Sequence, residues 1–342
     1  MGITLSSTAP GAGARNHSLD GLRGLAALSV ALGHCFEQVT GLALWGTSLR
    51  DFPSMPASAV AMRLMSSLFP ADAAVMVFFV LSGHVLWGSF QRKKPWFFAG
   101  LPEYAAARLY RLFPLVIVSA IPIGLLSSAS ARELAENMLL LSNSLNGVLW
   151  SLQVEVVASF ALFAFWGVTR GTGWKMGIGL ILAFGLTPLF RGYGPVVFFP
   201  AFILGASVSL IPPAFWQRGW LVAAGVLVMV FTNVVLGHGG ITRGFEMAGA
   251  TVVVGAVASG QLPFLKWRIP LFLGAISYPF YLTHLVGLLI SEPWLASLPA
   301  LSPVAMIVAR AVASIGVTIP LAWALHVFIE NPMLRARPRL TP

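Results

Sequence analysis

The feature that most constrains this chain is a series of apolar runs, each about as long as a helix that crosses a membrane. Only 9% of its 342 residues are charged, against roughly a quarter in a soluble globular domain. Backbone polar groups in lipid must be satisfied within the segment, which favours helices. The sequence therefore predicts an all-α, polytopic membrane protein with about ten transmembrane helices. They are expected at 19–38, 71–90, 112–128, 149–168, 174–190, 195–211, 219–237, 246–262, 270–291 and 303–329.

The connections between these runs are short, and no repeat or long linker separates them. Residues 57–69 are expected to form a short interfacial helix, and the polar segment 130–147 an amphipathic surface segment. We therefore expect one transmembrane domain over residues 18–333. It is flanked by a disordered cytoplasmic tail at 1–17 and a basic cytoplasmic tail at 334–342.

The net charge of +10 is best explained by basic residues in cytoplasmic loops, not by nucleic-acid binding. With ten spans, both termini lie on one side, and fourteen of the 21 Lys and Arg residues fall on that side against five on the other. This asymmetry predicts that both termini are cytoplasmic. The single cysteine, Cys35, cannot form an intrachain disulfide.

The first apolar run carries Arg23 and His34, eleven residues apart. In a helix this spacing puts both on one face, about 16 Å apart along the axis. One interpretation is a polar path into the membrane, and the other is a snorkelling Arg with a His that bonds a neighbouring helix. Asp20 either orients Arg23 or is an acid at the helix start. Glu37 either holds the ring of His34 or, as the sequence favours, is solvated.

A second basic pair follows in the segment AARLYRLFP, where Arg108 and Arg111 share a helix face at the cytoplasmic mouth of the third span. With Arg23 they would form a cluster of three guanidinium groups, which match phosphate oxygens in a bidentate manner. The alternative is simple anchoring of the helix by positive charge.

Polar residues in two later spans complete the candidate site. Ser151 and Glu155 are four residues apart at the start of a span, on the side predicted to lie away from the cytoplasm. Glu155 either activates an acceptor hydroxyl that arrives from outside or pairs with a neighbouring His or Arg. Tyr281 and His284 lie one turn apart on the same predicted helix. They either belong to the candidate site or are part of an aromatic belt at the membrane interface with one packed His. The six scattered His residues favour no metal site.

Five motifs follow one another along the chain, and a short sixth closes it: LDGLRGLAALSVALGH, FFVLSG, RLYRLFP, WSLQVE, SYPFYLTH and IENP. In this order they resemble the acyltransferase-3 family of integral membrane acyltransferases, which O-acylate sugars and lipids. The resemblance covers residues 18–332 and most closely fits the stand-alone form. Two places depart from the family pattern: His84 follows FFVLSG, and VVASF follows WSLQVE.

The resemblance implies an acyltransferase (EC 2.3.1.-) of the bacterial cytoplasmic membrane, with no permanently bound cofactor. Acyl-CoA, most commonly acetyl-CoA, would be the co-substrate on the cytoplasmic side, and a carbohydrate or lipid-linked glycan of the cell envelope would be the acceptor. The donor and acceptor would meet along a central path between the helices.

The same resemblance assigns roles to the candidate residues. Arg23, Arg108 and Arg111 would bind the CoA phosphates, and the thioester would lie near His34. His34 would be the acid–base or the carrier of a covalent acyl group. Glu155 would be the second catalytic residue, on the acceptor side. The residues expected to line the acceptor side or support the site are Ser151, Tyr281, His284 and Asp20.

A proton-coupled transporter or exporter is the competing class, because His, Glu and Arg inside a membrane also suit a proton relay. The lack of inverted repeats and the arginine cluster at one mouth argue against it. A structural subunit would instead tolerate changes at Arg23 and His34.

Overall fold

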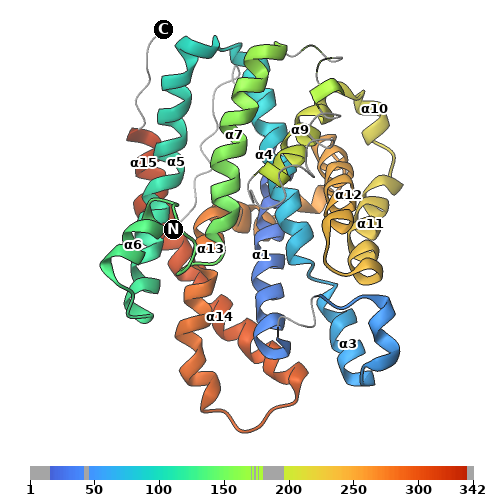
Figure 1. Ribbon diagram of the computed structural model, residues 1–342, viewed down its shortest axis with the longest axis vertical. Helices are drawn as coiled ribbons and strands as arrows, with labels where there is room; N and C mark the ends of the chain where they lie inside the picture. Colours follow the sequence, from blue (N-terminus) through green and yellow to red (C-terminus); the bar gives the residue numbers. More distant parts are fainter. Residues whose placement is uncertain are drawn as a thin grey trace.

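The structure is a computed structural model that describes residues 16–41, 46–170, 172, 175, 177–179 and 196–336. These residues form helices and no strands (Figure 1). The longer elements are α1 (His17–Thr40), α4 (Ala71–Lys93), α5 (Phe97–Leu126), α7 (Leu149–Thr169), α11 (Trp220–Leu236), α12 (Gly240–Ala258), α13 (Arg268–Ala296) and α14 (Pro303–Leu325). The shorter ones are η1 (Leu49–Ser54), α3 (Ala57–Ser66), α6 (Ala131–Met138), η3 (Val196–Phe198), α9 (Phe199–Ser207), η4 (Val208–Leu210), α10 (Pro213–Trp216), η5 (Pro263–Lys266), the π-helix η6 (His326–Glu330) and α15 (Asn331–Ala336).

Within the described residues, six helical segments are long and apolar enough to cross a membrane. They are Ala57–Lys93, Phe97–Leu126, Leu149–Thr169, Gly240–Ala258, Arg268–Ala296 and Pro303–Ala336. The predicted all-α, polytopic membrane architecture is therefore confirmed, while the count of ten spans stays a prediction. Most of the expected span 174–190 and most of the tails at 1–17 and 334–342 lie outside the described residues.

Helices α1 and α13 cross at very close range because glycines face each other across the contact. A Cβ atom added at Gly24 would lie 2.4 Å from the backbone nitrogen of Gly274, and one added at Gly274 would lie 2.2 Å from the carbonyl oxygen of Asp20. No side chain fits between backbones this close. The crossing brings the helix of Arg23 and His34 directly against the helix that carries Tyr281 and His284.

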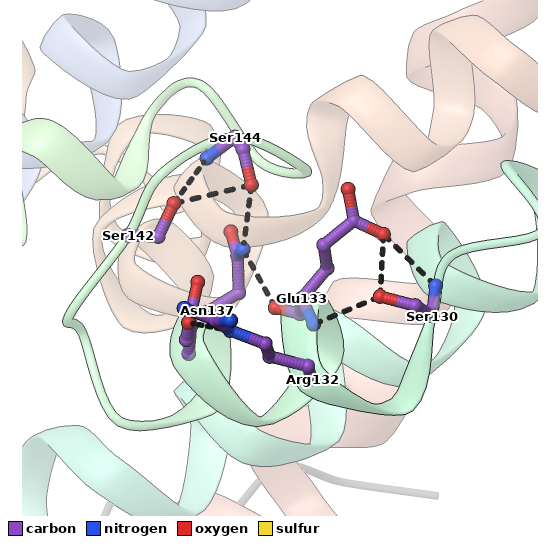
Figure 2. Close-up of polar contacts among 7 residues, drawn as sticks. Ser130, Arg132, Glu133, Asn137, Ser142 and Ser144 are labelled. Carbon is purple, nitrogen blue, oxygen red and sulfur yellow. Dashed lines mark hydrogen bonds and ion pairs between the residues drawn. The ribbon is translucent and has the colours of Figure 1, made fainter.

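The polar segment expected at 130–147 contains α6, which begins with a capping box (Figure 2). The backbone nitrogen of Glu133 donates to Ser130 Oγ at 3.2 Å, and that of Ser130 donates to the Glu133 carboxylate at 2.9 Å. This second bond is the main cause of the lowered pKa of Glu133. Together the two bonds satisfy free donors at the helix start.

Asn137, at the end of α6, holds the loop that leads into α7. Its Oδ1 accepts from the backbone nitrogens of Leu145 and Asn146 at 3.3 Å each. Asn146 Nδ2 in turn donates to the carbonyl oxygen of Leu282 on α13 at 3.0 Å. The loop is thereby fixed to α13 beside Tyr281, which sets the position of the first turns of α7.

We expect Gly274→Val to lower the stability of the folded protein, because the added side chain must push α1 away from α13. Overpacking of this kind costs about 1–3 kcal/mol, which thermal unfolding in detergent would measure. Gly316 on α14 is the matched control, since a Cβ there would meet nothing within 4 Å. Equal losses in Gly274→Val and Gly316→Val would contradict the close crossing.

Candidate functional site

A cavity of about 270 Å³ opens beside the α4–α5 connection, and we call it the entry cavity. Lys93 and Glu103, paired at 3.1 Å, line it near this connection. Its wall also includes residues further along α1, α5 and α7, which are Arg23, Arg108, Arg111 and Glu155.

The three arginines lie further along the helices than the Lys93–Glu103 pair. Arg111 follows Glu103 by eight residues of α5, a rise of about 12 Å. Figure 1 agrees, because the upper ends of α5 and α7 project beyond the start of α1, which carries Arg23. The predicted cluster is present, but it forms the floor of the cavity and not its mouth. The sequence could not show that α1 begins below its neighbours.

Arg108 and Glu155 form an ion pair between α5 and α7, with Nη1 and Oε1 3.3 Å apart. Their side chains are 9% and 22% exposed. Arg108 Nε also donates to Tyr104 Oη at 3.2 Å, and Ser82 Oγ donates to Glu155 at 3.5 Å. A charge this far from water needs a partner of opposite sign. Glu155 was expected either to activate an acceptor hydroxyl or to pair with a neighbouring His or Arg, and the geometry shows that it pairs with Arg108.

The other two arginines differ in their partners. Arg23 Nη1 lies 3.5 Å from Asp20 Oδ1, as expected if Asp20 orients the guanidinium. Among the described residues, no carboxylate lies within 4 Å of Arg111, which is exposed. Three guanidinium groups therefore face two carboxylates, and the floor carries one net positive charge. This arrangement suits the binding of an anion.

A second, smaller cavity of about 70 Å³ continues from this floor, and we call it the inner cavity. It shares Arg23, Arg111 and Glu155 with the entry cavity and extends to Ser151 and Tyr281. Ser151 Oγ and Tyr281 Oη are 2.8 Å apart. The structure thus brings together two residues that the sequence separated by 130 positions, along one polar path.

Beyond Tyr281 lies a pair of stacked imidazoles, His34 and His284, with ring centroids 5.3 Å apart and an interplanar angle of 25°. His34 Nδ1 lies 2.7 Å from Glu37 Oε2. His284 is 2% exposed, and its Nδ1 donates to the carbonyl oxygen of Tyr281 at 2.7 Å. The sequence favoured a solvated Glu37, and that interpretation was wrong because the carboxylate turns back onto His34. The three-residue spacing was the available signal.

His84, which departs from the family pattern after FFVLSG, lies away from the path. It faces α9, where a Cβ added at Gly205 would meet the backbone nitrogen of His84 at 2.9 Å. It is not among the residues that line either cavity. In the described part of the chain, no group of three or more His, Cys, Asp and Glu side chains is placed to hold a metal ion.

Comparison with known proteins gives one match. A family model described as an acyltransferase domain matches residues 16–327, which is nearly the whole chain. No curated protein and no solved structure match.

We expect the Arg108–Glu155 pair to show strong energetic coupling. Glu155→Gln leaves a buried guanidinium without its counter-charge and should cost about 3 kcal/mol, the lower end for a buried pair because Glu155 is partly exposed. Arg108→Met combined with Glu155→Gln should recover much of this loss. Thermal unfolding of both single variants and the double variant measures the coupling, and simple additivity would contradict it.

Proposed function

This chain belongs to the acyltransferase-3 family of membrane acyltransferases, and on that premise we propose the reaction that it catalyses. It moves an acetyl group from cytoplasmic acetyl-CoA to a hydroxyl of a carbohydrate or lipid-linked glycan of the cell envelope. The observation that carries this proposal is the polar path from the arginine floor, through Ser151 and Tyr281, to the stacked histidines. Family membership favours group transfer along this path over transport.

We place the protein in a bacterial cytoplasmic membrane with both termini on the cytoplasmic side. Basic residues support this orientation, because Arg92, Lys93 and Lys94 gather at the end of α4, where Lys93 lines the entry cavity. Arg170 joins them there, since its Nη1 donates to the carbonyl oxygen of Pro95. Excess Lys and Arg marks the cytoplasmic side of membrane proteins. A cytoplasmic donor would then enter beside these residues.

The donor's negatively charged phosphates bind at the arginine floor. Guanidinium groups donate parallel hydrogen bonds to phosphate oxygens, and Arg111 has no carboxylate partner that would compete for it among the described residues. From Arg23 to His34 the rise along α1 is about 16 Å. The pantetheine arm spans this distance through the inner cavity and carries the thioester toward His34. Glu155 acts on the donor side by orienting Arg108.

His34 supplies the acid–base chemistry. An ionised carboxylate only accepts hydrogen bonds, so Glu37 keeps the hydrogen of His34 on Nδ1 and leaves a lone pair on Nε2. That nitrogen takes the proton of the acceptor hydroxyl as its oxygen attacks the thioester carbonyl. The carbon–sulfur bond then breaks, and the proton passes to the departing thiolate of CoA. A transient acyl-histidine would use the same nitrogen.

The donor role of Arg111 is tested by binding. Acetyl-CoA should raise the melting temperature of the purified protein, because a ligand that binds the folded state stabilises it. Arg111→Ala should weaken acetyl-CoA binding by about 10-fold or more, the loss expected for a charged hydrogen bond. Arg132→Ala is the control, since Arg132 is 87% exposed on α6, away from both cavities. An equal effect of both substitutions would contradict the phosphate site.

The role of His34 is tested by group transfer. His34→Ala should lower transfer at least 100-fold, the low end for loss of general acid–base catalysis, while acetyl-CoA still stabilises the protein. Glu37→Gln should give a smaller loss in the same assay. Deletion of the gene, followed by complementation with each variant and mass spectrometry of envelope glycans, measures the O-acetyl groups. Wild-type acetylation by His34→Ala would end the proposal.

A further inference from the structure

The buried ring of His284 presents a hydrogen-bond acceptor that the described protein leaves unsatisfied. Its Nδ1 must carry the hydrogen, because the carbonyl oxygen of Tyr281 can only accept. Nε2 therefore bears a lone pair, and this atom is buried without a hydrogen-bond partner among the described residues. Buried polar atoms are nearly always paired, so an orphan of this kind points to a group that binds there.

The surroundings of this nitrogen distinguish it from other unpartnered buried atoms such as His84 Nδ1. The ring of His284 stacks on His34, and its centroid lies 5.8 Å from that of Tyr281. Tyr281 in turn contacts Ser151 at the wall of the inner cavity. The ring of His284 thus lies next to both the proposed base, His34, and Tyr281, which lines the inner cavity, whereas His84 packs against α9.

The number of hydrogens on the attacking hydroxyl shows what kind of molecule could pair with Nε2 of His284. In the proposed function, on which this inference rests, His34 removes the hydrogen of the attacking hydroxyl. A hydroxyl has one hydrogen, so the same group cannot also donate to His284. The two rings stack with centroids 5.3 Å apart, which is close enough for one bound molecule to reach both imidazoles. A molecule that satisfies both must therefore bring a second donor.

We propose that Nε2 of His284 accepts a hydrogen bond from a second hydroxyl of the acceptor. The acceptor is then a polyol, such as a sugar ring with a free hydroxyl beside the one that is acylated, and not a simple alcohol. A site built to bind a hydroxyl strongly rejects an analogue that lacks it, because its own polar atom is then left unpaired. His284 is in this view a specificity residue, while His34 remains the base.

Two substitutions separate this role from a structural one, because they mimic different nitrogens of the ring. The amide nitrogen of Asn takes the place of Nδ1, so His284→Asn keeps the bond to Tyr281 and removes the acceptor. The amide oxygen of Gln reaches the place of Nε2, so His284→Gln keeps an acceptor there. We expect His284→Gln to transfer at least 10-fold faster than His284→Asn, with acetyl-CoA stabilisation of the protein retained in both.

The assay follows label from acetyl-CoA into envelope preparations of a strain that lacks the gene, with purified protein added. His84→Asn serves as the control for the loss of a half-buried imidazole with a buried Nδ1, and its transfer rate per folded molecule should match the wild type. Faster transfer by His284→Asn than by His284→Gln would mean that His284 serves only to bond the carbonyl oxygen of Tyr281. Equal rates would mean that water fills the site or that His284 itself moves the proton, and either result overturns the proposal.

The wild-type product gives a test that does not depend on folding of the variants. NMR of the acetylated product should show a free hydroxyl on a carbon next to the ester. An acetylated simple alcohol, or an ester without such a neighbour, would overturn the role of His284 while leaving acyl transfer intact. If the wild type neither binds acetyl-CoA nor transfers its acetyl group, the proposed function itself fails.

Discussion

The site depends on the contact between α1 and α13, where backbone meets backbone through Gly24 and Gly274. Hydrophobic burial does not drive helices together in lipid, so close packing of small residues takes its place. This crossing puts His34 and His284 in stacking contact, although 250 positions separate them in the sequence. A larger residue at either glycine would push α1 from α13 and so move the two imidazoles apart without itself contacting either ring.

The three arginines inside the bundle differ in how firmly neighbouring side chains hold them. Arg108 is held by Glu155 and Tyr104, and Arg23 by Asp20, which leaves Arg111 as the guanidinium with the most capacity to bind an anion. Buried ion pairs contribute little net stability, because desolvation offsets their attraction. Their value here is positional, since each carboxylate fixes one guanidinium at the floor of the entry cavity.

Much of this arrangement could be predicted from the sequence, because it follows from local spacing. The apolar runs gave the helical membrane architecture, and the eleven-residue spacing put Arg23 and His34 on one face of α1. The depth of the arginines could not be predicted, because it depends on how far α1 is offset from α5. The partner of Glu155 and the position of His84 depend on which helices pack together. Those contacts leave no local pattern in a single sequence.

The two cavities along the path differ in volume, about 270 Å³ for the entry cavity and about 70 Å³ for the inner cavity, and Arg23 and Arg111 line both of them. In the proposed function, the bulky nucleotide of the donor belongs in the larger cavity, on the near side of these two arginines. Only the slender pantetheine arm and a small acyl group would then extend into the inner cavity toward Tyr281. In that arrangement the arginines would set where the nucleotide stops, and the length of α1 between Arg23 and His34 would set how far the thioester must reach.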